Sequence, residues 1–296
     1  MKILIYGNKG WIGSMMCKLM EQNNIDYIGS KVRANDKTGV EQELLNVNPT
    51  HVMSFIGRTH GSIGDKQYTT IDYLEQKGKI KENVRDNLFS PIVLALLCQK
   101  HNIHFTYLGT GCIFKYDELH ANGDETTGFR EDSLPNFFGS GYSVVKGYTD
   151  ELMHFFEDTV LNLRIRMPIT DTLEPRNFIT KITTYEYICS IPNAMTVLDD
   201  LLPVALDMAI KGITGTVNLT NPGLVSHNEI LQMYKETVDP TFTWKNFSPE
   251  EQAKILAADR SNNCLDTNKL KQLYPDIKHI KESVRETLIR ISSKVN

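Results

Sequence analysis

Cysteine is scarce in this sequence, and its spacing argues against a disulfide scaffold or a zinc site. Five cysteines occur in 296 residues, their number is odd, and no two of them form a CxxC pair. Disulfide frameworks and structural zinc sites both rely on paired or closely spaced cysteines. The histidines also lack partners at metal-ligand spacing, so we predict no metal site. We expect a protein of the reducing cytoplasm.

The sequence also lacks an excess of basic charge and any long apolar run. The formal net charge is -4, which offers no electrostatic footprint for nucleic acid or for an anionic membrane surface. The longest apolar run, Ile92–Cys98, is too short to span a bilayer. The N-terminal MKILIYG is likewise too short to be the core of a signal peptide. We therefore expect a globular protein without nucleic-acid or membrane partners.

Short β-rich runs alternate with helical patterns over the first part of the chain. Strands are expected at KILIYG, Asp26–Gly29, His51–Gly57, Ile103–Gly109, Leu161–Ile169 and Thr216–Thr220. Helices are expected after Gly13 and over Val40–Asn46, Asp72–His101 (with interruptions) and Tyr142–Thr159. This alternation predicts an α/β fold with a doubly wound parallel Rossmann sheet.

The second part of the chain has a different character. Two capping boxes, Ser226 with Glu229 and Ser248 with Glu251, each predict the start of a helix. We expect a sheet domain over residues 1–166 and a smaller, mostly helical lobe over 167–296. A strand near 215–221 should return to the sheet, so that the two parts interleave.

A glycine-rich turn follows the first predicted strand. It reads GNKGWIG, and its candidate contact residues are Gly7, Lys9, Gly10, Trp11, Ile12 and Gly13. Glycines between a strand and a helix let backbone N–H groups approach a pyrophosphate. The position directly after the first strand favours a dinucleotide-binding turn over a plain surface turn.

The end of the second strand bears on the choice of dinucleotide. An NAD site usually has an acidic residue there for the ribose 2′-hydroxyl, whereas this segment reads GSKVR. Arg33, and less directly Lys31, can pair with a 2′-phosphate. NADPH is therefore favoured, and a solvated loop charge is the alternative.

Tyr142 and Lys146 form a YxxxK pair. Residues four apart share one face of a helix, so the ammonium can lie near the phenol and favour its ionised form. Thr110 ends a predicted buried strand 32 residues earlier in the chain. YxxxK alone often arises as the ordinary polarity of a surface helix, but its position after Thr110 and behind an N-terminal glycine turn is hard to reach by chance.

These motifs resemble those of the extended short-chain dehydrogenases/reductases. In that family Ser/Thr, Tyr and Lys form the catalytic set, which implies Thr110, Tyr142 and Lys146 here. The resemblance also implies that Asn87 corresponds to the family's helix asparagine. Gly57 and Pro168 would then border the cofactor.

A narrower resemblance covers nearly the whole chain. The matching stretches are GNKGWIG, TGCIF, PNFFGSGYSVVK, LRIRMPI, PRNFITKIT, FTWKNF and EEQAK. They resemble the bifunctional 3,5-epimerase/4-reductases of UDP-rhamnose synthesis. The resemblance implies NADPH-dependent conversion of UDP-4-keto-6-deoxyglucose to UDP-L-rhamnose, with Cys112 and Lys181 as the epimerising pair. Residue type alone favours a buried structural thiol for Cys112, and the resemblance reverses that preference.

The resemblance also implies partners. A separate 4,6-dehydratase would supply the 4-keto substrate, and a homodimer is typical of the family. A related dTDP- or GDP-linked sugar remains an alternative substrate. A non-catalytic regulatory subunit is the alternative from another class, although retention of Thr110, Cys112, Tyr142 and Lys146 speaks against it.

Six residues are candidates for substrate contacts: Arg176, Asn177, Trp244, Arg260, Asn262 and Asn263. Arg260 and the two asparagines lie in a segment that resembles part of the dTDP-rhamnose-type reductases, with the arginine displaced by one place. For Arg176 and Asn177 the alternative is a helix N-terminus with its cap. For Trp244 the alternative to stacking on uracil is packing in the core.

Overall fold

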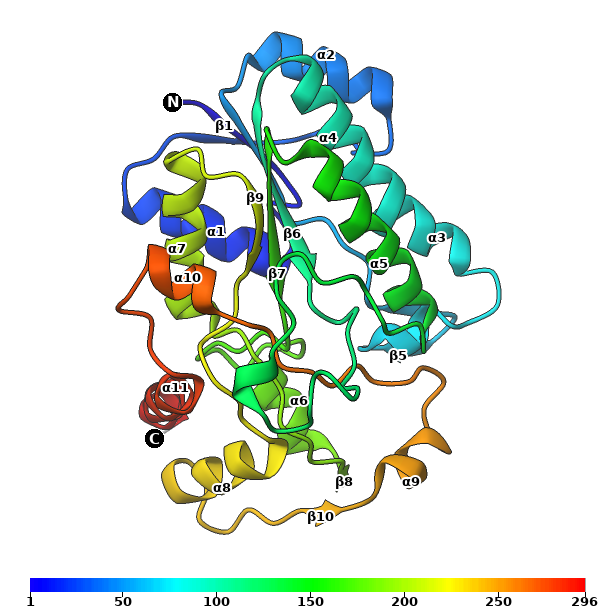
Figure 1. Cartoon of the computed structure of the whole chain (residues 1–296), viewed down its shortest axis with the longest axis vertical. Helices are drawn as coiled ribbons and strands as arrows, with labels where there is room; N and C mark the ends of the chain where they lie inside the picture. Colours follow the sequence, from blue (N-terminus) through cyan, green and yellow to red (C-terminus); the bar gives the residue numbers. More distant parts are fainter. Residues whose placement is uncertain (296) are drawn as a thin grey trace.

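The computed structural model describes residues 1–295 as a three-layer sheet domain with a helical lobe at one end (Figure 1). Six parallel strands form the main sheet in the order β2-β1-β3-β6-β7-β9. These strands are β1 (Ile3–Tyr6), β2 (Tyr27–Gly29), β3 (His51–Ser54), β6 (His104–Thr110), β7 (Val160–Ile165) and β9 (Gly215–Asn218). The predicted doubly wound parallel sheet is confirmed.

Helices cover both faces of this sheet. On one face α1 (Trp11–Gln22) and α7 (Leu198–Ile210) enclose a core with the inward side chains of β1, β7 and β9. On the other face lie α2 (Lys37–Val47), α4 (Ser90–Lys100) and α5 (Gly141–Met153). The central strands β1 and β7 are buried at every position, which explains their continuous rather than alternating hydrophobicity.

The expected helix over Asp72–His101 is divided in the structure. Its parts are the 3₁₀ turn η1 (Ile71–Tyr73), α3 (Ile80–Val84), the π-helical turn η2 (Arg85–Phe89) and α4. The expected helix over Tyr142–Thr159 is α5 followed by the 3₁₀ turn η4 (His154–Phe156). A hairpin of β4 (Gly61–Ile63) and β5 (Lys66–Tyr68) around Gly64-Asp65 was not predicted.

The lobe contains α6 (Phe178–Thr184), α8 (His227–Thr237), α9 (Pro249–Ala253) and α11 (Ile280–Val295), with the short strands β8 (Tyr187–Ile188) and β10 (Lys245–Asn246). Two smaller elements, the 3₁₀ turn η3 (Glu125–Thr127) and α10 (Asn268–Leu273), lie outside its core. Both predicted capping boxes are present, at the starts of α8 and α9. Residues of α6, α8 and α11 share the lobe's apolar core.

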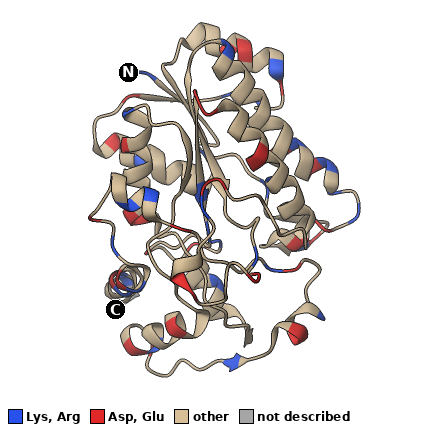
Figure 2. Cartoon of the chain, in the orientation of Figure 1, with Lys and Arg blue, Asp and Glu red and all other residues tan. Residues whose placement is uncertain are grey.

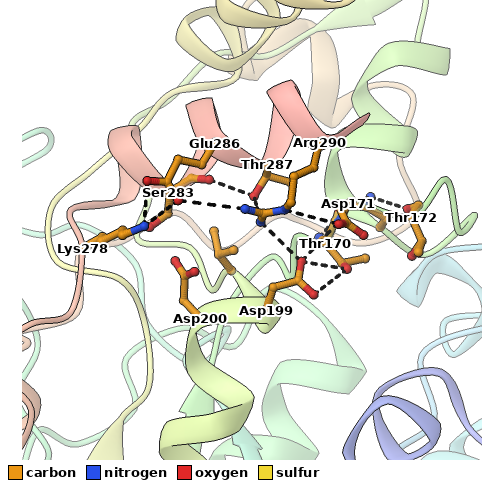
Figure 3. A network of polar contacts seen from close by, with 12 residues as sticks. Thr170, Asp171, Thr172, Asp199, Asp200, Lys278, Ser283, Glu286, Thr287 and Arg290 are labelled. Carbon is orange, nitrogen blue, oxygen red and sulfur yellow. Dashed lines mark hydrogen bonds and ion pairs between the residues drawn. The ribbon is translucent and has the colours of Figure 1, made fainter. Parts of the chain in front are cut away.

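A polar network joins the last helix to the sheet domain (Figure 3). Arg290 of α11 lies 3.3 Å from Asp171 and 3.8 Å from Asp199, which is in the first turn of α7. Thr170 donates a hydrogen bond of 3.1 Å to Asp199, and Lys294 pairs with Asp171 at 2.7 Å. These contacts hold the lobe against the sheet domain.

Charged residues of both signs are interspersed over the helices of both parts (Figure 2). Among residues 1–295, no helix combines the length and the apolar character that crossing a membrane requires.

Candidate active site

A cavity of about 750 Å³ opens at the carboxyl ends of the parallel strands, where the sheet domain meets the lobe. In parallel α/β sheets this is the edge at which ligands bind. Seven cationic side chains line it: Arg33, Arg58, Lys146, Arg166, Arg176, Lys181 and Arg260. Asp86 is the one carboxylate in the lining of the described chain. A molecule of negative net charge thus concentrates its cations where anionic ligands would bind.

The glycine turn adopts the backbone that an anion site requires. Gly7 has a positive φ of 79°, and a Cβ at Gly13 would lie 2.1 Å from the Gly7 carbonyl oxygen. Gly10 is the N-cap of α1 and makes no side-chain capping bond, so the first N–H groups of this helix can bind a ligand. The turn therefore fits a pyrophosphate.

The six predicted contact residues of this turn divide into two groups. Gly7, Gly10, Trp11 and Ile12 line the cavity. Lys9 is exposed and Gly13 is buried, and neither belongs to the lining. Gly13 instead allows the close approach of α1 to the turn, so its predicted direct contact is corrected to a packing role.

At the end of β2, Glu43 organises the loop that follows. Its carboxylate accepts hydrogen bonds from the hydroxyls of Tyr6 (2.7 Å) and Ser30 (2.6 Å) and from the Lys31 N–H (3.1 Å). The exposed Arg33 lines the cavity, whereas Lys31 does not. Sequence reasoning missed Glu43, which lies on α2 and not in the loop that it supports.

Asn87 supports the cavity by bonding the backbone of Arg58, which lies in the loop after β3. Its side chain accepts from the Arg58 N–H and donates to the Arg58 carbonyl, both at 2.8 Å. Asn87 is fully buried in the π-helical turn and lies outside the lining, which Gly57, Arg58 and Pro168 join. The predicted direct contact of Asn87 is therefore corrected: it clamps the loop that borders the cavity.

The five predicted catalytic residues line one cavity: Thr110, Cys112, Tyr142, Lys146 and Lys181. Thr110 ends β6, Tyr142 and Lys146 lie on α5, and Lys181 lies on α6 of the lobe. Burial raises the pKa of Tyr142, the charge of Cys112 adds to this, and a hydrogen bond with Thr110 opposes it. Cys112 is half-buried, whereas the other four cysteines are buried.

Lys146 has a partner that the sequence did not indicate. Its ammonium donates a hydrogen bond to the hydroxyl of Tyr107 on β6 and lies 4.7 Å from the centre of that ring. Burial lowers the pKa of Lys146 to about 8, although Asp150 and Cys112 act in the opposite direction. Lys146 and Tyr142 both line the cavity, and the expected effect of the ammonium on the Tyr142 phenol stays a prediction.

Lys181 is the second lysine of the cavity lining, and it is half-buried. Burial lowers its pKa, and the positive charges of Arg260 and Arg176 lower it further. An amine with a lowered pKa is neutral in a larger fraction of molecules near neutrality, so it can accept a proton.

Three of the six predicted substrate residues line the cavity: Arg176, Arg260 and Asn262. Arg176 pairs with Glu174 at 2.6 Å, and its guanidinium lies 5.7 Å from the Trp11 ring centre. Arg260 is hydrogen-bonded to Asp72 of η1. The Asp72 carboxylate also accepts from the N–H of Ala258, so it joins η1 to the segment that carries Arg260.

The other three lie outside the lining, and their predicted substrate contacts are corrected. Asn177 is the buried N-cap of α6 and donates to the carbonyls of Thr170 and Thr172, each at 2.8 Å. Trp244 stacks on Phe242 and donates to Asn228. Asn263 is fully buried and donates to the carbonyls of Gly111 and Phe114. Asn177 and Asn263 thus satisfy carbonyl groups of the protein itself, whereas Trp244 is half-buried and bonds a side chain of α8.

The described residues contain one cluster with metal-ligand atoms close together, formed by Asp150, Glu151 and His154. Arg164 already holds both carboxylate oxygens of Asp150, at 3.0 and 2.6 Å. This cluster is therefore explained as a buried ion pair.

The glycine turn on a parallel sheet, together with threonine, tyrosine and lysine at its carboxyl edge, defines a short-chain dehydrogenase/reductase. No family model matches the chain. It is 58% identical over 291 residues to a protein of Acanthamoeba polyphaga mimivirus, covering 98% of this chain and 99% of that one. The crystal structure of a UDP-rhamnose synthase from the same virus, also 58% identical, superposes with a TM-score of 0.93 over 98% of this chain and 99% of that one.

Two relatives from Arabidopsis thaliana carry fuller names. A bifunctional dTDP-4-dehydrorhamnose 3,5-epimerase/dTDP-4-dehydrorhamnose reductase is 45% identical over 282 residues, 95% of this chain and 90% of that protein. A trifunctional UDP-glucose 4,6-dehydratase/UDP-4-keto-6-deoxy-D-glucose 3,5-epimerase/UDP-4-keto-L-rhamnose-reductase is 44% identical over 96% of this chain but 41% of its own length. The chain belongs to the family of 3,5-epimerase/4-reductases of nucleotide-rhamnose synthesis, and it is an enzyme.

Proposed function

We propose that the enzyme converts UDP-4-keto-6-deoxyglucose to UDP-L-rhamnose by two epimerisations, at C3 and C5, and one NADPH-dependent reduction at C4. The observation that carries this proposal is the cavity that Cys112 and Lys181 share with Thr110, Tyr142 and Lys146. Both chemical steps act on one ketone, so their residues belong in one pocket. Identity of 58% to a UDP-rhamnose synthase favours the uridine nucleotide over the dTDP named for one plant relative.

The residues of the sheet domain fit NADPH. Gly7, Gly10 and the uncapped start of α1 would hold the pyrophosphate, and Arg33 would hold the 2′-phosphate. When bound, NADPH supplies the hydride for C4 of the sugar. We propose that residues 1–166, with α7 and β9 packed onto the same sheet, form the cofactor domain, and that the remainder of 167–296 completes the substrate site.

Epimerisation depends on the protein's own acids and bases. The 4-keto group acidifies the protons at C3 and C5, so that a base can remove each and leave an enolate. Thr110 and Tyr142 donate hydrogen bonds to the enolate oxygen. Cys112 and Lys181 serve opposite faces of the sugar, one removing the proton and the other returning one with inverted configuration. In the last step Tyr142 gives its proton to O4.

Product analysis by NMR tests the whole proposal. The enzyme is incubated with UDP-4-keto-6-deoxyglucose and NADPH in heavy water. We expect UDP-L-rhamnose with deuterium at C3 and C5. A product reduced at C4 but without solvent deuterium would leave a simple ketoreductase.

We expect activity to fall at alkaline pH as Lys146 loses its proton. Its protonated form favours proton release by Tyr142, and its pKa is about 8 because it is buried. The kcat/KM for reduction should therefore decline as the pH rises through about 8. In a Lys146→Arg variant the decline should move to higher pH, since arginine keeps its charge. A decline that stays in place would assign it to another group.

We expect Arg33 to determine the preference for NADPH over NADH. Replacing it with alanine should raise KM for NADPH by about tenfold, the effect of losing one charge-assisted hydrogen bond. KM for NADH should change little, because that cofactor lacks the 2′-phosphate. Steady-state kinetics with both cofactors separate this result from a general loss of binding.

We propose a homodimer through the outer faces of α5 and α4. On α5 and η4, Tyr148, Leu152 and Phe155 follow one another at helical spacing and are 61%, 38% and 79% exposed. Leu96 of the adjacent α4 is 46% exposed. Such an apolar face on neighbouring helices suits a second copy of the chain.

A double variant, Tyr148→Asp with Phe155→Asp, is expected to be monomeric by light scattering while its circular dichroism is unchanged. Leu119→Asp is the matched control, because Leu119 is equally exposed, at 79%, but lies far from this face in the sequence. A dimer that survives the double change would exclude α5 from the interface.

We also propose where the substrate comes from and in which compartment the enzyme works. A 4,6-dehydratase, the first activity named for the longer plant relative, would supply the 4-keto sugar. Five free cysteines suit a reducing cytoplasm.

A further inference from the structure

The backbone of Cys112 is fixed on both sides by hydroxyl groups. Its N–H donates to Thr110 Oγ1 at 3.0 Å, and its carbonyl accepts from Ser143 Oγ at 2.7 Å. Thr110 lies on the same strand end as Cys112, whereas Ser143 lies on α5, directly after Tyr142. The Ser143 bond is thus a link between the loop that carries the thiol and the helix that carries the phenol.

The preceding residue is held from other directions. The Gly111 carbonyl accepts from Arg166 Nη1 and from Asn263 Nδ2, both at 2.9 Å. A Cβ at this position would lie 2.7 Å from Leu265 and 3.0 Å from Arg166. These contacts place the loop relative to β7 and the segment after α9, but they do not reach α5.

Ser143 is oriented so that its hydroxyl hydrogen points at Cys112. Ser140 Oγ donates to Ser143 Oγ at 2.9 Å, which occupies the acceptor side of the Ser143 hydroxyl. The Ser143 N–H in turn donates to Ser140 Oγ at 3.0 Å, as part of the N-cap of α5. Ser143 is 1% exposed and lines the cavity. A buried hydroxyl with both roles assigned is rigid.

We propose that Ser143 is a positioning residue for epimerisation: its hydroxyl fixes Cys112 relative to the ketone held by Thr110 and Tyr142. The inference rests on the proposed function. Proton transfer from a carbon next to the ketone depends steeply on where the thiol lies, and a displacement of about 1 Å can cost up to a hundredfold in rate. Reduction uses Thr110, Tyr142 and Lys146, which keep their places without this hydrogen bond.

The test compares two rates in the full-length enzyme and its Ser143→Ala variant. The first is deuterium incorporation at C3 and C5 of UDP-4-keto-6-deoxyglucose. The second is NADPH-dependent reduction of the same sugar after it has been epimerised by wild-type enzyme. We expect the first rate to fall by at least about tenfold and the second to change by less than about twofold.

Ser140→Ala is the matched control on the same helix. It removes the N-cap of α5 but leaves the Ser143 hydroxyl in place to donate to Cys112. The melting temperature should therefore fall, while the ratio of the two rates should change less than in Ser143→Ala. Equal losses of both rates in Ser143→Ala, or no loss of deuterium incorporation, would overturn the role of Ser143. A wild-type enzyme that neither exchanges nor reduces the sugar would instead overturn the proposed function.

Discussion

Replacing Cys112 with alanine is expected to abolish deuterium incorporation at C3 and C5 while a pre-epimerised 4-keto sugar is still reduced. Removing a general acid–base group typically costs about 100-fold to 10,000-fold in rate, so exchange should fall below detection. Reduction should persist because Thr110, Tyr142 and Lys146 remain in the same cavity. NMR in heavy water measures the exchange, and NADPH consumption measures the reduction.

Cys264→Ala is the matched control for this variant. Cys264 is 3% exposed in a separate apolar cluster and does not line the cavity. It should lose some stability through the lost packing but keep both rates. Normal exchange in Cys112→Ala would remove the thiol from the mechanism and leave Lys181 without its partner.

Replacing Tyr142 with phenylalanine is expected to lower the rate of reduction by about 100-fold or more, because O4 then lacks its proton donor. The loss should be chemical rather than structural. Tyr142 is only 8% exposed, so the ring remains packed and only its hydroxyl is removed. Deuterium exchange should also fall, by a smaller factor, since Thr110 still donates to the enolate oxygen.

The matched control is Tyr148→Phe on the same helix. Tyr148 is 61% exposed and is not among the residues that line the cavity. Turnover and melting temperature should both stay at wild-type values. Near-normal reduction by Tyr142→Phe would rule out the tyrosine as the proton donor.

The helices and strands of the sheet domain were largely predictable from the sequence, although their ends were not. The strand expected over His51–Gly57 ends at Ser54, because the backbone then turns into the cavity wall. The strand expected over Leu161–Ile169 ends at Ile165, after which Arg166 donates its N–H to Thr196 instead of to a strand. Periodicity gives the type of an element, whereas its end depends on where neighbouring backbone stops offering partners.

Residues with a local signal were assigned more successfully than those without one. The capping boxes at Ser226 and Ser248 are formed within four residues, and both are present. Asn177 and Asn263 were candidate ligand contacts, and both are buried and bonded to the backbone. For Asn177 the alternative of a helix cap is confirmed, since it is the N-cap of α6. For Asn263 no local pattern distinguishes an asparagine that satisfies a carbonyl from one that faces a ligand.

The residue sequence determined the class of fold and the chemistry available, because β-strand and helix periods, the glycine turn and YxxxK are all local patterns. Only the tertiary structure decided which groups meet. Cys112 and Lys181 share a cavity because a strand end and a helix of the lobe converge there. Lys146 binds Tyr107, and Ser143 binds the Cys112 carbonyl, across 39 and 31 residues of chain. Contacts between residues so far apart in the chain depend on how strands and helices pack together. Composition and local spacing do not determine that packing.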